Sequence, residues 1–127
     1  MPLHPEPIDV PALPPNNSNY SQAVRLGGLL FLSGQLGVDP VTRRVVPGGV
    51  EEQTRQAIEN LGTVLAAAGS GLDRVAKVNI FIRDFSALPA MNKVYAQYFP
   101  HRPAKTTVEI TGLDQGALIE VEVVAAV

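Results

Sequence analysis

The sequence has 127 residues, no cysteine and a formal net charge of −2, with an isoelectric point near 5.6. This length suits a single domain with a buried core, and the lack of cysteine excludes disulfides, thiolate catalysis and thiolate metal ligands. The acidic balance argues against nucleic-acid binding, which normally requires a basic face. The two histidines, His4 and His101, are not in a metal-ligand spacing, so we expect no bound metal.

The ends of the chain carry no membrane or export signal that we can identify. No apolar run approaches the length of a membrane span, and the N-terminus lacks the basic and apolar regions of a signal peptide. We therefore expect a cytoplasmic protein that does not interact with membranes. Residues 1–19 are rich in proline and asparagine, which disfavour helix, and we interpret them as a leader to one domain spanning 1–127.

The first half of the chain predicts a hairpin followed by a helix. Two short apolar runs flank the Gly27–Gly28 pair and indicate a β-hairpin between residues 20 and 33, with a minor strand near Val45. Residues 50–68 are the clearest helix, because their apolar positions recur at steps of three and four. Gly69 is expected to cap this helix in a left-handed conformation.

The second half predicts another helix between strands. Residues 75–82 alternate in the manner of a β-strand, and residues 84–99 predict a helix that ends before Pro100. Two further alternating runs, 104–110 and 119–123, predict the last strands. The order of elements indicates an α+β fold in which two helices cover one face of a mixed sheet of about six strands.

The charged residues of the last two strands suggest where a site lies. If these strands pair with each other, Lys105 and Glu109 share a face with Glu120 and Glu122. That face would be the one that the helices leave uncovered, and it would suit an interface between subunits with the charged groups at a cleft. The simpler alternative is a cross-strand ion pair between Lys105 and one of the glutamates.

A set of short segments occurs in a fixed order from about Tyr20 to the C-terminus. The segments are Tyr20-Ser-Gln-Ala-Val, Leu32-Ser-Gly-Gln35, Ala67-Ala-Gly69, Val75-Ala-Lys-Val-Asn-Ile-Phe-Ile-Arg-Asp84, Met91-Asn-Lys-Val-Tyr95, Phe99-Pro100, Arg102-Pro-Ala and Ile119-Glu-Val-Glu122. Their co-linear order resembles the RidA/YjgF family, the reactive-intermediate deaminases also called endoribonuclease L-PSP proteins.

The resemblance implies a fold, an assembly and an activity. The fold is the chorismate-mutase-like α+β type, and the assembly is a homotrimer with a central barrel and three sites at subunit interfaces. The activity is a hydrolase reaction that converts small 2-imino and enamino acids to 2-oxo acids and ammonia, detoxifying reactive metabolites without a cofactor. The implied partners are a small carboxylate metabolite and further copies of the chain, not nucleic acid.

The resemblance also implies site residues, one of which departs from the family. The glutamate that positions water matches Glu120, and the pocket residues match Tyr20, Ser33 and Asn92. Lys105 stands where the family usually has a carboxylate-binding arginine, Thr107 where it often has cysteine, and Ser18-Asn19 where it has Gly-Pro. Lysine binds a planar carboxylate less rigidly than arginine does. We therefore expect a weakened or re-specified deaminase, with Lys105 as the anion anchor and Glu120 as the general base.

Three other interpretations stay open. Lys105 can be an amine nucleophile toward an oxo substrate, although nearby carboxylates would favour its ammonium form. The protein can also be a ligand-binding or chaperone-like trimer that holds a small carboxylate without turnover. RNA cleavage is disfavoured, because a basic patch with interleaved aromatics and a catalytic histidine pair are both missing. Tyr95 and Tyr98, at helical spacing, are interpreted as core residues.

Overall fold

The computed structural model of the chain describes residues 3–14 and 19–127. The strands and helices are β1 (Glu6–Pro7), β2 (Ala23–Leu26), β3 (Leu29–Leu32), β4 (Gln35–Leu36), α1 (Gly49–Ala67), β5 (Val75–Ile82), α2 (Leu88–Tyr98), β6 (Ala104–Glu109) and β7 (Ile119–Ala126). Short 3₁₀ turns lie at Leu72–Arg74, Phe85–Ala87 and Asp114–Gly116. The predicted hairpin, both predicted helices and the last three strands are confirmed.

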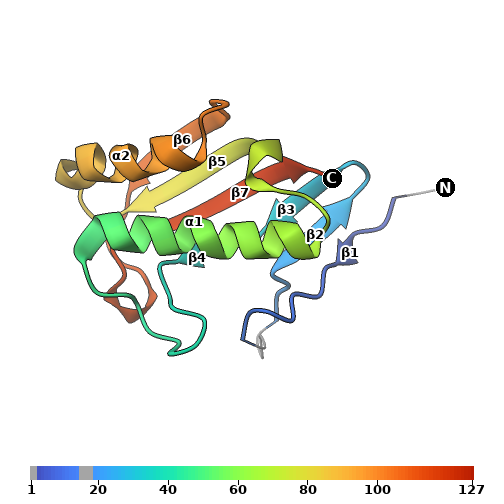
Figure 1. Cartoon of the computed structure of the whole chain (residues 1–127), viewed down its shortest axis with the longest axis horizontal. Helices are drawn as coiled ribbons and strands as arrows, with labels where there is room; N and C mark the ends of the chain where they lie inside the picture. Colours follow the sequence, from blue (N-terminus) through green and yellow to red (C-terminus); the bar gives the residue numbers. More distant parts are fainter. Residues whose placement is uncertain (1–2, 15–18) are drawn as a thin grey trace.

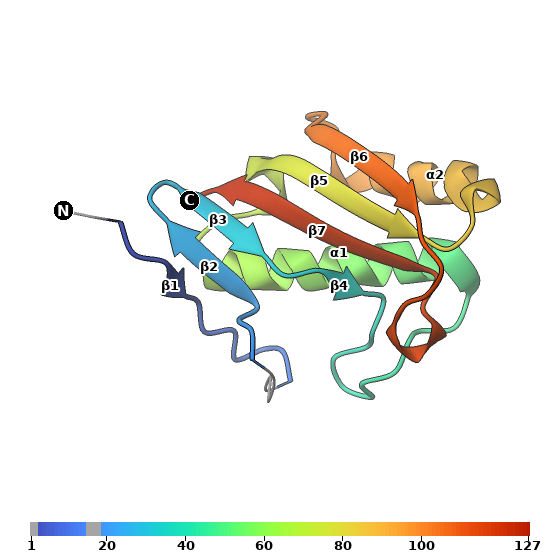
Figure 2. The ribbon, with the colours of Figure 1, turned by 180° about the vertical axis from the view of Figure 1, so that it is seen from behind.

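The strands form one mixed sheet of seven strands in the order β1-β2-β3-β7-β5-β6, with β4 also paired to β7. Strands β5 and β6 run parallel and are connected through α2, while the other pairs are antiparallel. Figures 1 and 2, which view the molecule from opposite sides, show α1 and α2 on the same face of this sheet. The predicted α+β architecture is therefore confirmed.

Helix α1 forms because its apolar positions make one continuous stripe. Ala57, Ile58 and Leu61 have no exposed surface, and they pack in the same core cluster as the inward positions of the sheet. The helix ends in a Schellman motif, in which the Ser70 N–H donates to the Leu65 carbonyl at 2.8 Å. Gly69 supplies the required left-handed residue, with φ 77°, as predicted.

The N-terminal segment packs on the domain more than a leader would. Strand β1 pairs with β2, and Val10 and Leu13 are each only 8% exposed in the main core. Burying these two apolar side chains fixes the segment to the domain. Ser18, which with Asn19 replaces the usual Gly-Pro of the family, lies outside the described residues. The predicted minor strand near Val45 is reduced to a single bridge with Val38.

The prediction that places Lys105 on the same face as Glu120 is wrong. Strand β5 lies between β6 and β7, so the last two strands do not pair with each other. Lys105 stands opposite Val78 in the β5–β6 register, and Glu120 stands opposite Phe81 in the β5–β7 register. Because neighbouring residues on β5 alternate between faces, Lys105 points to the helix side and Glu120 to the open side.

Polar side chains of α1 hold two segments that adjoin the sheet. The Asn60 amide, only 4% exposed, donates to the Leu36 carbonyl at 3.3 Å and the Val38 carbonyl at 2.9 Å. The Gln53 side-chain oxygen accepts from the Leu118 N–H at 2.8 Å. These bonds tie the segments after β4 and before β7 to the helix. No helix within residues 3–14 and 19–127 combines the length and apolarity needed to cross a membrane.

We expect Asn60→Ala to lower the free energy of unfolding by about 1–2 kcal/mol, because the Val38 carbonyl would lose the Asn60 donor and the Leu36 carbonyl would keep only the Val38 N–H. The same substitution at the exposed helical residue Asn92 is the matched control and should cost much less. Urea unfolding at fixed protein concentration measures both changes. Equal losses in the two variants would show that the Asn60 bonds do not hold the loop.

Candidate functional site

A first cavity, of about 300 Å³, lies on the Glu120 side of the sheet. Its lining combines the segment after β3, the loop before β7 and Glu120, as follows: Tyr20, Gln22, Gly34, Gln35, Leu36, Val38, Asp114, Gln115 and Glu120. Two of the residues that the family resemblance predicted, Tyr20 and Glu120, are thus brought to one cavity. The exposed fraction of Tyr20 is 55%, so it borders the cavity mouth and is not a core aromatic.

Glycine at position 34 lets the chain pass against the Glu120 side chain. A Cβ atom built on Gly34 would lie 2.8 Å from the Glu120 Cδ, closer than real Cβ contacts. Beyond it, the Gln35 side-chain amide donates to the Gln22 side-chain oxygen at 2.7 Å and fixes the adjoining wall. The Glu120 carboxyl therefore has a defined place beside the backbone of residue 34 and polar amides on the next wall.

The opposite wall of this cavity is a loop held by polar contacts. Gln115 adopts a left-handed conformation, with φ 57°, and its side-chain oxygen accepts from the Val45 N–H at 3.3 Å. Its side-chain nitrogen donates to the Arg43 carbonyl, also at 3.3 Å. The Gln53 bond to Leu118 fixes the other end of the loop. Two segments far apart in the chain thus meet at the Glu120 cavity.

The Glu120 carboxyl is half-buried and lies close to a second carboxylate. Burial raises its pKa above that of an ordinary glutamate, and the negative charge of Glu122 raises it further. Glu122 is itself held by the Asn79 amide, which donates to its Oε1 at 3.1 Å. A carboxylate with a raised pKa is a stronger proton acceptor than an ordinary glutamate, which suits a general base.

The second group of predicted site residues lies on the helix side of the sheet, at the edge strand β6. The Lys105 Nζ donates to the Asn92 Oδ1 at 3.0 Å, so these two predicted residues do meet. The same ammonium lies 4.4 Å from the centre of the Tyr95 ring, in a cation–π contact. No salt bridge joins Lys105 to Glu120 or Glu122, and the sheet between them prevents one, so the ion-pair alternative is wrong.

The remaining predicted site residues, Ser33 and Thr107, do not line the Glu120 cavity. The Ser33 hydroxyl donates to the Ser21 carbonyl at 2.7 Å. Thr107 stands opposite Ile80 on β5 and shares the helix-side face with Lys105. The described residues contain no group of three or more histidine, aspartate or glutamate side chains placed to hold a metal ion.

Sequence reasoning missed several residues around both groups. Gln22, Gln35 and Gln115 came into view only with the fold, although Gln35 ends the Leu32–Gln35 segment that carries the family resemblance. Tyr95 is buried as predicted, yet it also contacts Lys105. Arg102 lines a cavity with Lys105, and its proximity along the chain was the signal that could have found it.

Comparisons with known proteins place the chain among close structural and sequence relatives. A family model described as endoribonuclease L-PSP matches residues 11–127. A 2-iminobutanoate/2-iminopropanoate deaminase from Capra hircus is 40% identical over 107 residues, which cover 84% of this chain and 78% of the goat protein. Two solved structures of bacterial proteins are similar over almost the whole chain.

The first of these structures is the Rid-family protein YyfA from Yersinia pestis, of unknown function. It has a TM-score of 0.92 and 38% identity, covering 98% of this chain and 100% of that one. The second is TdcF from E. coli with bound serine, with a TM-score of 0.88 and 30% identity, covering 96% of this chain and 98% of that one. At these identities the likeness extends beyond the fold to sequence.

The raised pKa of Glu120 predicts how stability depends on pH. A carboxyl whose folded-state pKa is raised stabilises the fold below the ordinary glutamate pKa of about 4.3, and this contribution is lost as pH rises through the folded value. We therefore expect Glu120→Gln to be more stable than the wild type at pH 7 and to lose this advantage toward pH 4. Urea unfolding at fixed protein concentration across this range measures the difference.

The control for this prediction is Glu52→Gln, which changes an exposed glutamate in the first turn of α1. The prediction is contradicted if Glu120→Gln is less stable than the wild type at pH 7, or if both variants follow the same pH trend.

Proposed function

This chain belongs to the endoribonuclease L-PSP family, which includes the RidA/YjgF proteins, and from that membership we propose that it hydrolyses small 2-imino or enamino acids to 2-oxo acids and ammonia. The observation that carries the proposal is the half-buried Glu120 carboxyl with a raised pKa, beside a polar cavity. The goat relative is named for this reaction at 40% identity.

The proposed reaction uses water, one carboxyl group and one cation. Lys105 binds the substrate carboxylate, and Glu120 accepts a proton from a water molecule as that water attacks the electrophilic C=N carbon. The protonated Glu120 returns this proton to the imine nitrogen, which gives a neutral carbinolamine. Glu120 then takes the hydroxyl proton of the carbinolamine and passes it to the amino nitrogen, so that the C–N bond breaks, the carbonyl forms and ammonia leaves. Tyr20 closes the cavity mouth and orients the substrate. No cofactor is needed, because water is the only co-reactant.

One copy of the chain does not place these two residues on the same substrate. Lys105 lies on the helix side of edge strand β6, and Glu120 lies on the open face of β7, with β5 between them. We therefore propose that each site forms between copies, with Lys105 from one copy completing the Glu120 cavity of the next. A homotrimer, as the family resemblance implies, gives every copy both roles.

The open face of the sheet supports an interface between copies. Leu29 and Phe31 on β3 are 43% and 42% exposed, and Val108 on β6 is 40% exposed. Their pairing registers place them on the face opposite the helices, together with Phe81 and Val124. Apolar groups gathered on one open face are typical of a surface that a partner covers.

Other chemistries fit these residues less well. The contacts of Lys105, with an amide oxygen and an aromatic face, are those of an ammonium ion, which favours anion binding over nucleophilic attack. RNA cleavage remains disfavoured by the net charge of −2. A ring nitrogen of His101 is within hydrogen-bond distance, 2.9 Å, of the Val75 carbonyl, which is a structural contact.

We predict that the wild type releases ammonia from freshly generated 2-iminopropanoate and that Glu120→Ala lowers kcat by about 100-fold or more, the range of general acid–base catalysis. Glu52→Ala, at an exposed glutamate of α1, is the control for loss of a carboxylate. Circular dichroism checks that each variant is folded. An active Glu120→Ala variant would remove the carboxyl from the mechanism.

Lys105→Arg tests the anchor separately. An arginine fork binds a carboxylate at two points, so we expect kcat/KM to rise by about tenfold, corresponding to ~1.4 kcal/mol of added binding in the transition state. Lys105→Ala should lower kcat/KM because no cation is left at this position. Equal activity of the wild type and Lys105→Ala would exclude Lys105 as the anchor.

Gly34→Ala tests the close approach of the chain to Glu120. The added methyl group would displace the Glu120 carboxyl, so we expect kcat to fall about tenfold or more while the far-UV spectrum stays unchanged. Gly112→Ala is the matched control, because a Cβ there meets no atom within 4 Å. Full activity in Gly34→Ala would show that the carboxyl position is not critical.

A further inference from the structure

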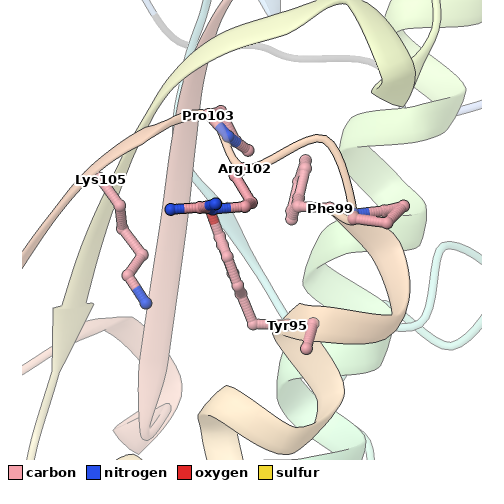
Figure 3. A pocket seen from close by; sticks show the side chains of 7 residues that line it. Tyr95, Phe99, Arg102, Pro103 and Lys105 are labelled. Atoms are coloured by element: carbon pink, nitrogen blue, oxygen red, sulfur yellow. The ribbon is translucent and has the colours of Figure 1, made fainter.

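A second cavity, of about 390 Å³, lies between the C-terminal end of α2 and the start of β6. Its lining includes two cations, Arg102 and Lys105, and the apolar surfaces of Tyr95, Phe99 and Pro103. Figure 3 shows Lys105 and Arg102 extending from the β6 side and the Tyr95 ring extending from α2 toward them. Lys105 belongs both to this cavity and to the proposed deaminase site. The cavity lies on the helix side of the sheet, whereas Glu120 lies on the open side.

The positive charge in this cavity has no acidic partner among the described residues. Within residues 3–14 and 19–127, the salt bridges join Arg55 to Glu52 and Lys93 to Glu51, and none involves Arg102 or Lys105. The Arg102 side chain also makes no hydrogen bond to any described residue. Two neighbouring cations beside an apolar floor repel each other, and an anion that reaches both would relieve this repulsion.

The Tyr95 hydroxyl is a second, independent sign that a ligand binds here. Tyr95 is only 8% exposed, and its hydroxyl is buried without a hydrogen-bond partner among the described residues. Burial raises the pKa of this hydroxyl, so it stays a neutral donor at physiological pH. A buried donor without an acceptor is costly and rare in folded proteins, and it calls for a partner outside the chain.

The backbone at Arg102 has an unusual conformation. Its φ is 59°, in the left-handed region that an arginine rarely adopts, and its N–H donates to the Phe99 carbonyl at 3.2 Å. Proline on the C-terminal side of this residue restricts the turn further. Strain of this kind tends to be kept at binding sites, where it fixes the direction of a side chain.

We propose that this cavity selects dicarboxylic substrates, with Lys105 binding the carboxylate next to the reacting carbon and Arg102 and the Tyr95 hydroxyl binding a second, distal carboxylate. The inference rests on the proposed function in one respect, the assignment of Lys105 as the anchor. The apolar surfaces of Phe99 and Pro103 suit the methylene groups between the two carboxylates. A substrate with an uncharged side chain would leave the Arg102 charge without a counter-ion.

Calorimetric titration with product-like 2-oxo acids tests this site without requiring turnover. The matched pair is 2-oxoglutarate, with a distal carboxylate, and 2-oxo-4-methylpentanoate, with an apolar group of similar size. We expect the wild type to bind 2-oxoglutarate at least about tenfold more tightly, a difference of ~1.4 kcal/mol. Arg102→Gln should remove this preference with little effect on 2-oxo-4-methylpentanoate, and exposed Arg74→Gln is the charge control.

Tyr95→Phe separates a ligand-binding hydroxyl from one that is merely buried. Because the hydroxyl has no hydrogen-bond partner among the residues that the structure describes, its removal should not lower Tm, yet it should weaken 2-oxoglutarate binding several-fold. Unchanged 2-oxoglutarate binding in Tyr95→Phe would remove this hydroxyl from the site. A preference that persists in Arg102→Gln, or is absent from the wild type, would overturn the proposal as a whole.

The binding experiment and the ammonia assay test the dicarboxylate site and the deaminase proposal separately, so either proposal can fail without the other. If the wild type shows the Arg102-dependent preference but releases no ammonia from any imino acid, the deaminase proposal fails and the dicarboxylate site stands. If it releases ammonia from the imino acid of leucine as readily as from that of glutamate, and binds both oxo acids equally, the deaminase proposal stands and the dicarboxylate site fails.

Discussion

The position of β5 between β6 and β7 fixes where the candidate site residues lie. Its backbone hydrogen-bonds to β6 on one side and β7 on the other, and its apolar side chains Val78, Ile80 and Ile82 are buried under the helices. A strand buried in this way fixes the register of both neighbours, because a slip of one residue would expose its apolar face. Lys105 and Glu120 are therefore held on opposite faces of one sheet.

Two consequences follow from this separation. The helix side is closed over its core, so Lys105 reaches solvent only at the free edge of β6, beside Asn92 and Tyr95. The open side keeps apolar groups such as Phe31 exposed and half-buries Glu120. A second copy that covers the open face would further desolvate Glu120 and raise its pKa in the same direction as burial does in the single chain.

Much of the fold could be predicted from local patterns. Three- and four-residue spacing located α1, strict alternation located β5 and β7, and Gly69 marked the end of a helix. Strand pairing could not be predicted in this way. Alternation shows which residues of a strand share a face, but it does not show which strand lies next to it. The strand–helix–strand order of β5, α2 and β6 favours a parallel pair, and this signal was not used.

For the candidate site, too, the residues could be named from the sequence but their arrangement in space could not. Family resemblance implied a single site with Tyr20, Ser33, Asn92, Lys105 and Glu120. In the structure Tyr20 lines a cavity with Glu120, and Asn92 contacts Lys105 at 3.0 Å. The resemblance did not indicate that these pairs lie on different faces. Arg102 and the Tyr95 hydroxyl were missed because their meaning depends on burial and on the absence of partners, which only three-dimensional structure shows.

We propose that Lys105 and Glu120 act on one substrate from different copies of the chain. Subunit complementation tests it most directly: Lys105→Ala and Glu120→Ala proteins are assayed alone and after co-refolding as a mixture. The claim predicts that each variant alone is nearly inactive and that the mixture regains ammonia release, because some interfaces then combine an intact Lys105 with an intact Glu120. A mixture no more active than its separate components, with mixed oligomers confirmed by mass spectrometry, would contradict it.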